Sequence, residues 1–159
     1  MDDHAATQAD VTPIDLQAPG IADRIVEIQR AAYAVEAELI GFDGIPPLTE
    51  TTDQVRSRTD LHWRGVHEHG ALVGVIAWSV DDHANDIDRL AVVPRWARRG
   101  HGRRLVRAVP SDRPTVVSTG TANIPALALY RGEGFRAVET TEIAPGITIT
   151  HLRREPPAG

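Results

Sequence analysis

Apolar residues recur at three- and four-residue steps between residues 21 and 39, and elsewhere they fall in short alternating or continuous runs. The first pattern predicts an amphipathic helix over about 22–39, because such steps place side chains on one helical face. The shorter runs predict strands. Their expected ranges are 11–17, 63–68, 71–80, 87–93, 115–118, 136–143 and 147–153.

Polar and glycine-rich positions separate these segments and predict further helices. Thr52 is expected to cap a short helix, and Asn123 is expected to cap another with Pro125 near its start. A third helix is predicted from Gly102 onward. Residues 41–48 contain two glycines and two prolines and are predicted to be irregular. The alternation of helices and strands predicts an α/β (α+β) protein with helices packed on a mixed sheet.

Length and composition narrow the class of protein. A chain of 159 residues can bury one substantial core, predicted over 11–155 after a flexible tail at 1–10. The absence of cysteine excludes disulfides, thiolate metal sites and a cysteine nucleophile. A net charge of −5 argues against bulk nucleic-acid binding. No apolar run approaches the about 20 residues of a membrane span, and the N-terminus lacks the signal-peptide pattern. We therefore expect a cytoplasmic protein that binds neither nucleic acid nor membrane.

Positive charge is concentrated in one stretch. The chain has no lysine, and seven of its 17 arginines lie between Arg89 and Arg107. Here a predicted strand passes Pro94 into the loop Arg98-Arg99-Gly100-His101-Gly102-Arg103 and then into a helix. Glycines let the main chain approach an anion, and the N–H groups at a helix start carry partial positive charge. The pattern predicts a phosphate-binding loop. For the arginines alone, a solvated helix face is the alternative.

Two motifs resemble signatures of a known family, the GCN5-related N-acetyltransferases (GNAT). The strand ending in Val92-Val93-Pro94, with the loop Arg98 to Arg103, resembles the acetyl-CoA loop of that family. Asn123 to Tyr130, followed by Gly134-Phe135, is similar to the second signature. The family loop usually begins with Arg or Gln where this chain has Ala97. With the order of elements, the resemblance covers roughly 11–153 and implies a mixed, mostly antiparallel sheet of about seven strands flanked by about four helices.

The resemblance also implies acetyl-CoA as cosubstrate. No metal is expected, because His67-Glu68-His69 lacks the HExxH spacing and has no third ligand nearby in the sequence. The main chain of the strand before the loop would pair with the pantetheine arm, and the loop would hold the pyrophosphate. The cofactor-binding residues expected on this basis are Leu90, Ala91, Val92, Arg98, Arg99, Gly100, His101, Gly102, Arg103 and Asn123. A plain core strand is the alternative for Leu90 to Val92, and a helix N-cap is the alternative for Asn123.

Direct acyl transfer needs a neutral amine, a polarised thioester and a proton for the leaving thiolate. Tyr130 matches the usual general acid of the family, with a packing aromatic as the alternative. Asp86 and Asp88 are two apart on a strand and project from the same face. Either could take the amine proton, directly or through water, or hold the cation, or simply pair at the strand end.

The acceptor side is implied to lie on the first helices and the loop after them. Glu36, Glu50 and neighbouring carboxylates make that region acidic, so a cationic primary amine is the expected acceptor. Tyr33 would line the same pocket or belong to the core. We expect an N-acetyltransferase working through a ternary complex. A non-catalytic acyl-CoA-binding module of the same fold is the alternative, and a homodimer would fit the family.

Overall fold

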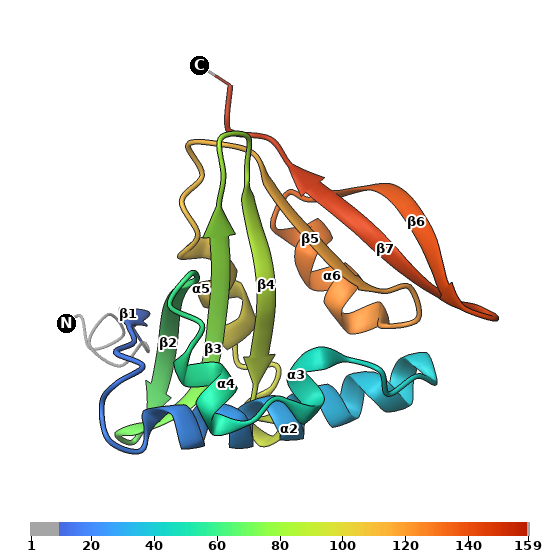
Figure 1. The fold of residues 1–159 in the computed structure, drawn as a ribbon. Coiled ribbons are helices and arrows are strands. Elements are labelled where there is room, and N and C mark those ends of the chain that lie inside the picture. The colour runs from blue at the N-terminus through green and yellow to red at the C-terminus, as the bar shows by residue number, and fades with distance from the viewer. Residues whose placement is uncertain (1–9, 159) are drawn as a thin grey trace.

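The computed structural model describes residues 10–158, so the predicted tail lies almost entirely outside the described residues. One seven-stranded sheet organises the chain, in the order β1-β2-β3-β4-β5-β7-β6 (Figure 1). Its strands are β1 (Thr12–Pro13), β2 (His62–Glu68), β3 (Ala71–Val80), β4 (Asn85–Val92), β5 (Thr115–Gly120), β6 (Arg136–Ala144) and β7 (Ile147–Arg154). All neighbouring strands are antiparallel except β4 and β5, which confirms the predicted mixed sheet.

Five α-helices accompany this sheet in residues 10–158, one more than predicted. They are α2 (Ile21–Ile40), α3 (Pro46–Thr49), α4 (Thr52–Arg56), α5 (His101–Arg107) and α6 (Ile124–Gly132), with a 3-10 turn, η1 (Pro94–Trp96). The prediction that 41–48 is irregular is wrong from Pro46 onward. Prolines occupy the first positions of α3, where their fixed φ suits a helix and their missing N–H removes no intrahelical bond.

Two helix caps show how local sequence sets the element boundaries. Thr51, rather than the predicted Thr52, caps α4: its hydroxyl accepts from the Gln54 N–H at 3.2 Å, and the Gln54 side chain accepts from the Thr51 N–H at 2.9 Å. Asn123 caps α6 as predicted, because its side-chain oxygen accepts from the Ala126 N–H at 3.2 Å. The predicted edge strand over 11–17 is reduced to β1.

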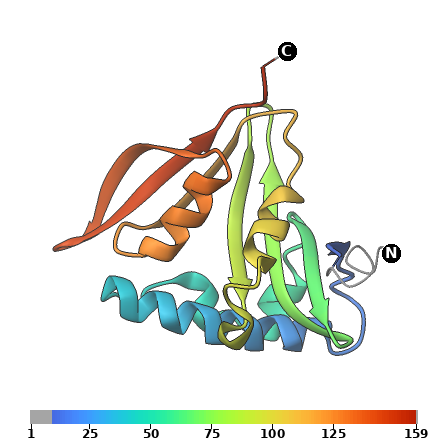
Figure 2. The ribbon, with the colours of Figure 1, turned by 180° about the vertical axis from the view of Figure 1, so that it is seen from behind.

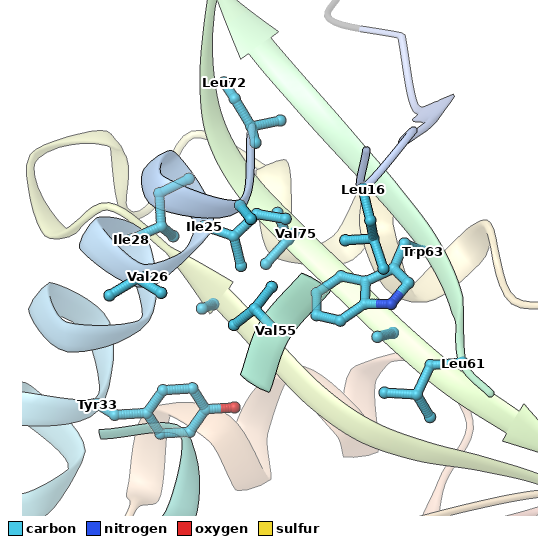
Figure 3. Packing of buried hydrophobic residues seen from close by; sticks show 13 residues of the cluster. Leu16, Ile25, Val26, Ile28, Tyr33, Val55, Leu61, Trp63, Leu72 and Val75 are labelled. Atoms are coloured by element: carbon cyan, nitrogen blue, oxygen red, sulfur yellow. The ribbon is translucent and has the colours of Figure 1, made fainter. Parts of the chain in front are cut away.

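The central part of the sheet is covered on both faces, whereas β6 is exposed along almost its whole length. On one face, residues of α2 and α4 pack on β2 and β3, with Ile25, Val55 and Trp63 at the centre of the cluster (Figure 3). On the opposite face, seen in Figure 2, α5 and α6 supply Leu105 and Leu127 to a second cluster. Within the described part of the chain, no helix is long and apolar enough to cross a bilayer.

β4 carries a bulge that changes which way its side chains point. Ile87 pairs with Trp78 and Arg89 with Ala77, so Asp88 has no partner across the ladder. An extra residue interrupts the alternation of faces. Ile87 therefore packs with the cluster under α5, whereas Asp88 and Arg89 both turn toward the α2 side, where they meet Arg58 and Glu50.

Candidate functional site

β4 and β5 are joined over only part of their length. Their parallel ladder consists of Asn85–Thr115, Asp86–Val116 and Ile87–Val117, and beyond it the two strands diverge. In Figure 1 the gap widens toward the end of the sheet that α2 crosses. A cavity of about 1040 Å³ occupies this region and is lined by α2, the second half of β4, the Arg98–Arg103 loop, the end of β5 and α6.

The edge of β4 facing the gap presents main-chain polar groups. The Val93 N–H donates to the Val73 carbonyl at 2.9 Å, so the backbone of Val93 faces β3. Backbone groups alternate in direction along a strand, so those of Leu90 and Val92 face the gap and those of Ala91 face β3. The Leu90 N–H donates to the Tyr33 hydroxyl at 3.1 Å, in agreement with this alternation.

The glycine-rich loop has the left-handed backbone that its glycines favour. Gly100 has a φ of 84° and immediately precedes α5. Arg98 also has a positive φ, 65°, which is uncommon for a residue with a Cβ. A Cβ at Gly102 would lie 3.2 Å from Leu129 Cδ2, so the loop packs closely on α6. The positive φ values and the close packing on α6 together define the main-chain conformation of this loop.

His101 anchors this loop rather than facing solvent. Its ring is buried, with Nε2 2.8 Å from Glu68 Oε2 and Nδ1 3.3 Å from Arg104 Nη1. Arg104 also donates to the Arg99 carbonyl at 3.1 Å. The imidazole thus ties the start of α5 to the end of β2.

Five of the seven arginines between Arg89 and Arg107 fall into two groups. Arg89, Arg104 and Arg107 are bonded within the protein. Arg98 and Arg103 line the cavity and form no ion pair with any residue in 10–158. Their charge is therefore available to an anionic ligand at the loop end of the cavity.

Another part of the cavity contains an ionic network centred on the buried Arg89. Its guanidinium contacts Glu50 and lies 2.6 Å from Asp88 Oδ2, and its Nη1 donates to Gln29 Oε1 at 2.9 Å. Only 2% of the Arg89 side chain is exposed. Asp88 is also 3.8 Å from Arg58 Nη2. The predicted site residues Glu50 and Asp88 are therefore already paired with cations.

Glu36, Tyr33 and Tyr130 meet near the gap. Asn123 Nδ2 donates to Glu36 Oε1 at 3.0 Å, which links the start of α6 to the middle of α2. Burial raises the pKa of Glu36, and the Asn123 hydrogen bond partly opposes that shift. Burial and the charge of Glu36 raise the pKa of the Tyr33 hydroxyl.

Tyr130 lies in α6 with its ring edge against Phe135, the ring centres being 5.5 Å apart. It is 4% exposed and lines the cavity. Burial raises its pKa above the usual phenol value, and nearby Tyr33 and Glu36 raise it further. The phenol is thus held neutral, as a hydrogen-bond donor.

The two predicted aspartates differ in their surroundings. Asp88 lines the cavity, whereas Asp86 is not among its lining residues. Burial raises the pKa of Asp86, and the charges of Asp88 and Asp81 add to that effect.

Sequence reasoning missed Gln29, Glu68, Arg58 and the pairing role of Arg89. An arginine followed by the apolar run Leu90 to Val93 within a predicted strand is a signal for the last of these. The roles of Gln29, Glu68 and Arg58 have no signal in the sequence, because each depends on a partner that is distant in the chain.

Comparison with known proteins identifies the family. A model of the acetyltransferase (GNAT) domain matches residues 49–156. The chain is 36% identical over 134 residues to the UPF0157 protein YqkA of Bacillus subtilis strain 168, which is 82% of this chain and 39% of that protein. The chain thus spans about two fifths of the length of this curated relative.

Two solved structures show the same fold. The ribosomal-protein-S18-alanine N-acetyltransferase of Escherichia coli superposes with a TM-score of 0.74 at 13% identity, covering 96% of each chain. The PaiA N-acetyltransferase of Thermoplasma acidophilum, in complex with coenzyme A, gives a TM-score of 0.66 at 13% identity, over 93% of this chain and 99% of that one. This chain belongs to the GNAT acetyltransferase family. Membership of this family supports acyl transfer from an acyl-CoA.

Proposed function

We propose that this protein transfers the acetyl group of acetyl-CoA to a primary, cationic amine by direct attack within a ternary complex. The observation that carries the proposal is one continuous cavity. It is lined by the Arg98–Arg103 loop, the free edge of β4, Tyr130 and Glu36 of α2. Two substrates that enter from opposite ends would meet at the gap between β4 and β5.

The residues at the loop end fit coenzyme A. The backbone groups of Leu90 and Val92 that face the gap suit the amides of a pantetheine arm, although the Leu90 N–H must first leave the Tyr33 hydroxyl. Gly100 and Gly102 allow a phosphate to approach the main chain. Arg98 and Arg103 form no ion pair with any residue in 10–158 and supply positive charge, whereas Arg99 lies 4.8 Å from the Trp96 ring centre and does not line the cavity. When bound, acetyl-CoA supplies the acetyl group as an activated thioester.

Tyr130 is the proposed partner of the leaving sulfur. Its raised pKa favours donation of a hydrogen bond from a neutral hydroxyl over formation of a free tyrosinate. The amine nitrogen would therefore lose a proton, and the Tyr130 hydroxyl would pass a proton on to the thiolate. Asn123 would border the pantetheine, while its side chain continues to cap α6.

The aspartates remain candidates for the proton acceptor. Asp88 is within the cavity, but its carboxylate is shared with Arg89 and Arg58. Asp86 would act only through water, because it does not line the cavity. Their contribution is measured by the pH–rate profiles of Asp88→Asn and Asp86→Asn.

A thiol-release assay with acetyl-CoA tests the proposed function. The acceptor panel should contain alkyl amines, a polyamine, an aminoglycoside, a lysine peptide and a peptide with a free N-terminus, with the matching alcohols as controls. We expect release that depends on an amine, with the N-acetyl product identified by mass. Tight acetyl-CoA binding without release above hydrolysis would instead indicate a non-catalytic acyl-CoA-binding module.

A further inference from the structure

The carboxylates of the cavity differ in whether a cation already neutralises them. Three acidic side chains line it in the described part of the chain: Glu36, Glu50 and Asp88. Arg89 pairs with both Glu50 and Asp88. Glu36 forms no ion pair with any residue in 10–158, and its partner is the neutral amide of Asn123. Among these three, Glu36 alone retains uncompensated negative charge for an incoming cation.

Glu36 is also placed at the reacting end of the cavity. It lies one turn after Tyr33 in α2. The Tyr33 hydroxyl accepts a hydrogen bond from the N–H of Leu90 on the free edge of β4. Asn123 binds Oε1 of Glu36 from the start of the helix that carries Tyr130. A single hydrogen bond to Oε1 leaves the remaining carboxylate lone pairs open to a ligand.

We propose that Glu36 binds the cationic amine of the acceptor and takes its proton, in place of Asp86 or Asp88. The inference rests on the proposed N-acetyl transfer and specifies one of its catalytic residues. Binding and proton removal are compatible in one group, because the ammonium that pairs with the carboxylate is also the acid that must lose a proton.

The environment of Glu36 makes it a better base than an exposed carboxylate. An alkyl ammonium has a pKa of about 10.4 and an ordinary glutamate about 4.3, so proton transfer between them in water is strongly unfavourable. Burial raises the pKa of Glu36 and therefore narrows that gap. The same burial strengthens its attraction for a cation.

The protons and bonds balance as follows. The ammonium gives one proton to the Glu36 carboxylate, and the nitrogen lone pair forms a C–N bond with the thioester carbonyl carbon. The C–S bond breaks, and its electron pair leaves on sulfur. The nitrogen loses a second proton, which reaches the sulfur through the Tyr130 hydroxyl. Glu36 then releases its proton to water, so the products are an amide, a thiol and one proton.

The test compares Glu36→Gln with Glu38→Gln, a matched change on the same helix at an exposed residue that does not line the cavity. Glutamine keeps an oxygen for the Asn123 amide but cannot accept the proton. In the parent protein kcat/KM should rise with pH through the raised pKa of Glu36. Glu36→Gln should lower kcat/KM about 10²–10³-fold and remove that limb, while Glu38→Gln keeps the parent profile.

A second acceptor separates chemistry from structure. Trifluoroethylamine is neutral at the assay pH, so it needs no base before attack. The deficit of Glu36→Gln relative to the parent should fall below about tenfold with this amine. A deficit that stays equal for both amines would indicate a structural role for Glu36 and would overturn the inference.

Thermal unfolding gives a readout that is independent of turnover. The folded-state pKa of Glu36 is raised, so its ionised form destabilises the fold and its protonated form does not. Glu36→Gln should therefore raise Tm at about pH 7, and the gain should disappear as the pH falls through the folded pKa toward about 4. An unchanged or lower Tm at neutral pH would argue against a half-buried Glu36 carboxylate without an ion-pair partner in residues 10–158.

The outcomes distinguish failure of the Glu36 assignment from failure of the proposed N-acetyl transfer. If the parent acetylates amines and Glu36→Gln keeps both its rate and its pH limb, the inference fails and the proposed function stands. Loss of the limb in Asp88→Asn, with Glu36→Gln unaffected, leads to the same conclusion. If the parent transfers acetyl to no amine in the panel, the proposed function fails, and the assignment of Glu36 fails with it.

Discussion

At the scale of single residues, Arg89 is the most constrained side chain of the cavity. It is almost fully buried, and its donors are taken up by Glu50, Asp88 and Gln29, with the Trp63 ring centre 5.1 Å from the guanidinium carbon. A buried charge persists only where partners replace the lost water. Arg89 thus joins β4, α2 and the segment before α4 into one unit beneath the acceptor side of the cavity.

Replacing Arg89 by methionine should destabilise the protein by about 3 kcal/mol, because Glu50 and Asp88 would keep their charge without a cation. Urea unfolding measures this loss. Arg95→Met, at an exposed position, is the control and should change stability by less than about 0.5 kcal/mol. Adding Glu50→Gln to Arg89→Met should recover part of the loss, and no recovery would contradict the pairing.

Tyr130 contributes a single hydroxyl to the site, while its ring packs on Phe135. Tyr130→Phe keeps the packing and removes the hydroxyl that we propose as the donor for the leaving sulfur. We expect kcat to fall about 10²–10⁴-fold, the range for a lost general acid, with an unchanged Kd for acetyl-CoA. Steady-state kinetics with calorimetric binding measures both. Full activity would remove Tyr130 from the mechanism.

At the scale of elements, two glycines help to position α2 and the loop. A Cβ on Gly120 would lie 2.3 Å from Ile40 Cγ2, so the end of β5 reaches the end of α2 only through a glycine. The loop before α5 depends likewise on Gly100, whose φ of 84° disfavours a side chain. Gly120 thus permits the contact between β5 and α2, and Gly100 permits the backbone conformation of the loop.

Gly100→Val should abolish measurable acetyl-CoA binding while the fold survives. The left-handed backbone costs about 1–2 kcal/mol for a residue with a Cβ, which would shift the loop but not unfold the domain. Calorimetry and circular dichroism measure binding and fold. Gly132→Ala, with open space around its Cβ position, is the control and should bind normally. Unchanged affinity in Gly100→Val would remove the loop from the cofactor site.

At the scale of the whole molecule, the sheet consists of two parts held by a short ladder. β1 to β4 form one part and β5 to β7 the other, and three parallel residue pairs connect them. The Asn123–Glu36 hydrogen bond and the contact of Gly120 with Ile40 supply further links across the open end. A ligand seated in the gap would add contacts to both parts.

Acetyl-CoA should therefore stabilise the folded protein. At about 100 times Kd a ligand that binds only the native state adds about 2.7 kcal/mol, which corresponds to a rise in Tm of about 5–10 °C for a domain of this size. Differential scanning fluorimetry measures this shift, and hydrogen exchange should slow at Leu90 and Val92. The Gly100→Val protein is the control, and an equal shift in it would place the ligand elsewhere.

Most elements could be predicted from the sequence because their signals are local. The apolar spacing of α2, the short apolar runs of the strands and the Asn123 cap each lie within one short segment. The bulge at Asp88 could not be predicted, since it is defined by the pairing of β4 with β3. The short α3 was missed because its prolines were interpreted only as helix breakers.

The loop Arg98 to Arg103, the motif Asn123 to Tyr130 and the acidic character of α2 each consist of residues that are close together in the chain. The sequence alone therefore determines these features. Which carboxylates remain free is a property of the folded chain. Arg89 and Gln29 are 60 positions apart, and Asn123 and Glu36 are 87 positions apart. The charge available to an acceptor depends on such pairings between distant residues, so an acidic segment alone does not specify which carboxylate meets the amine.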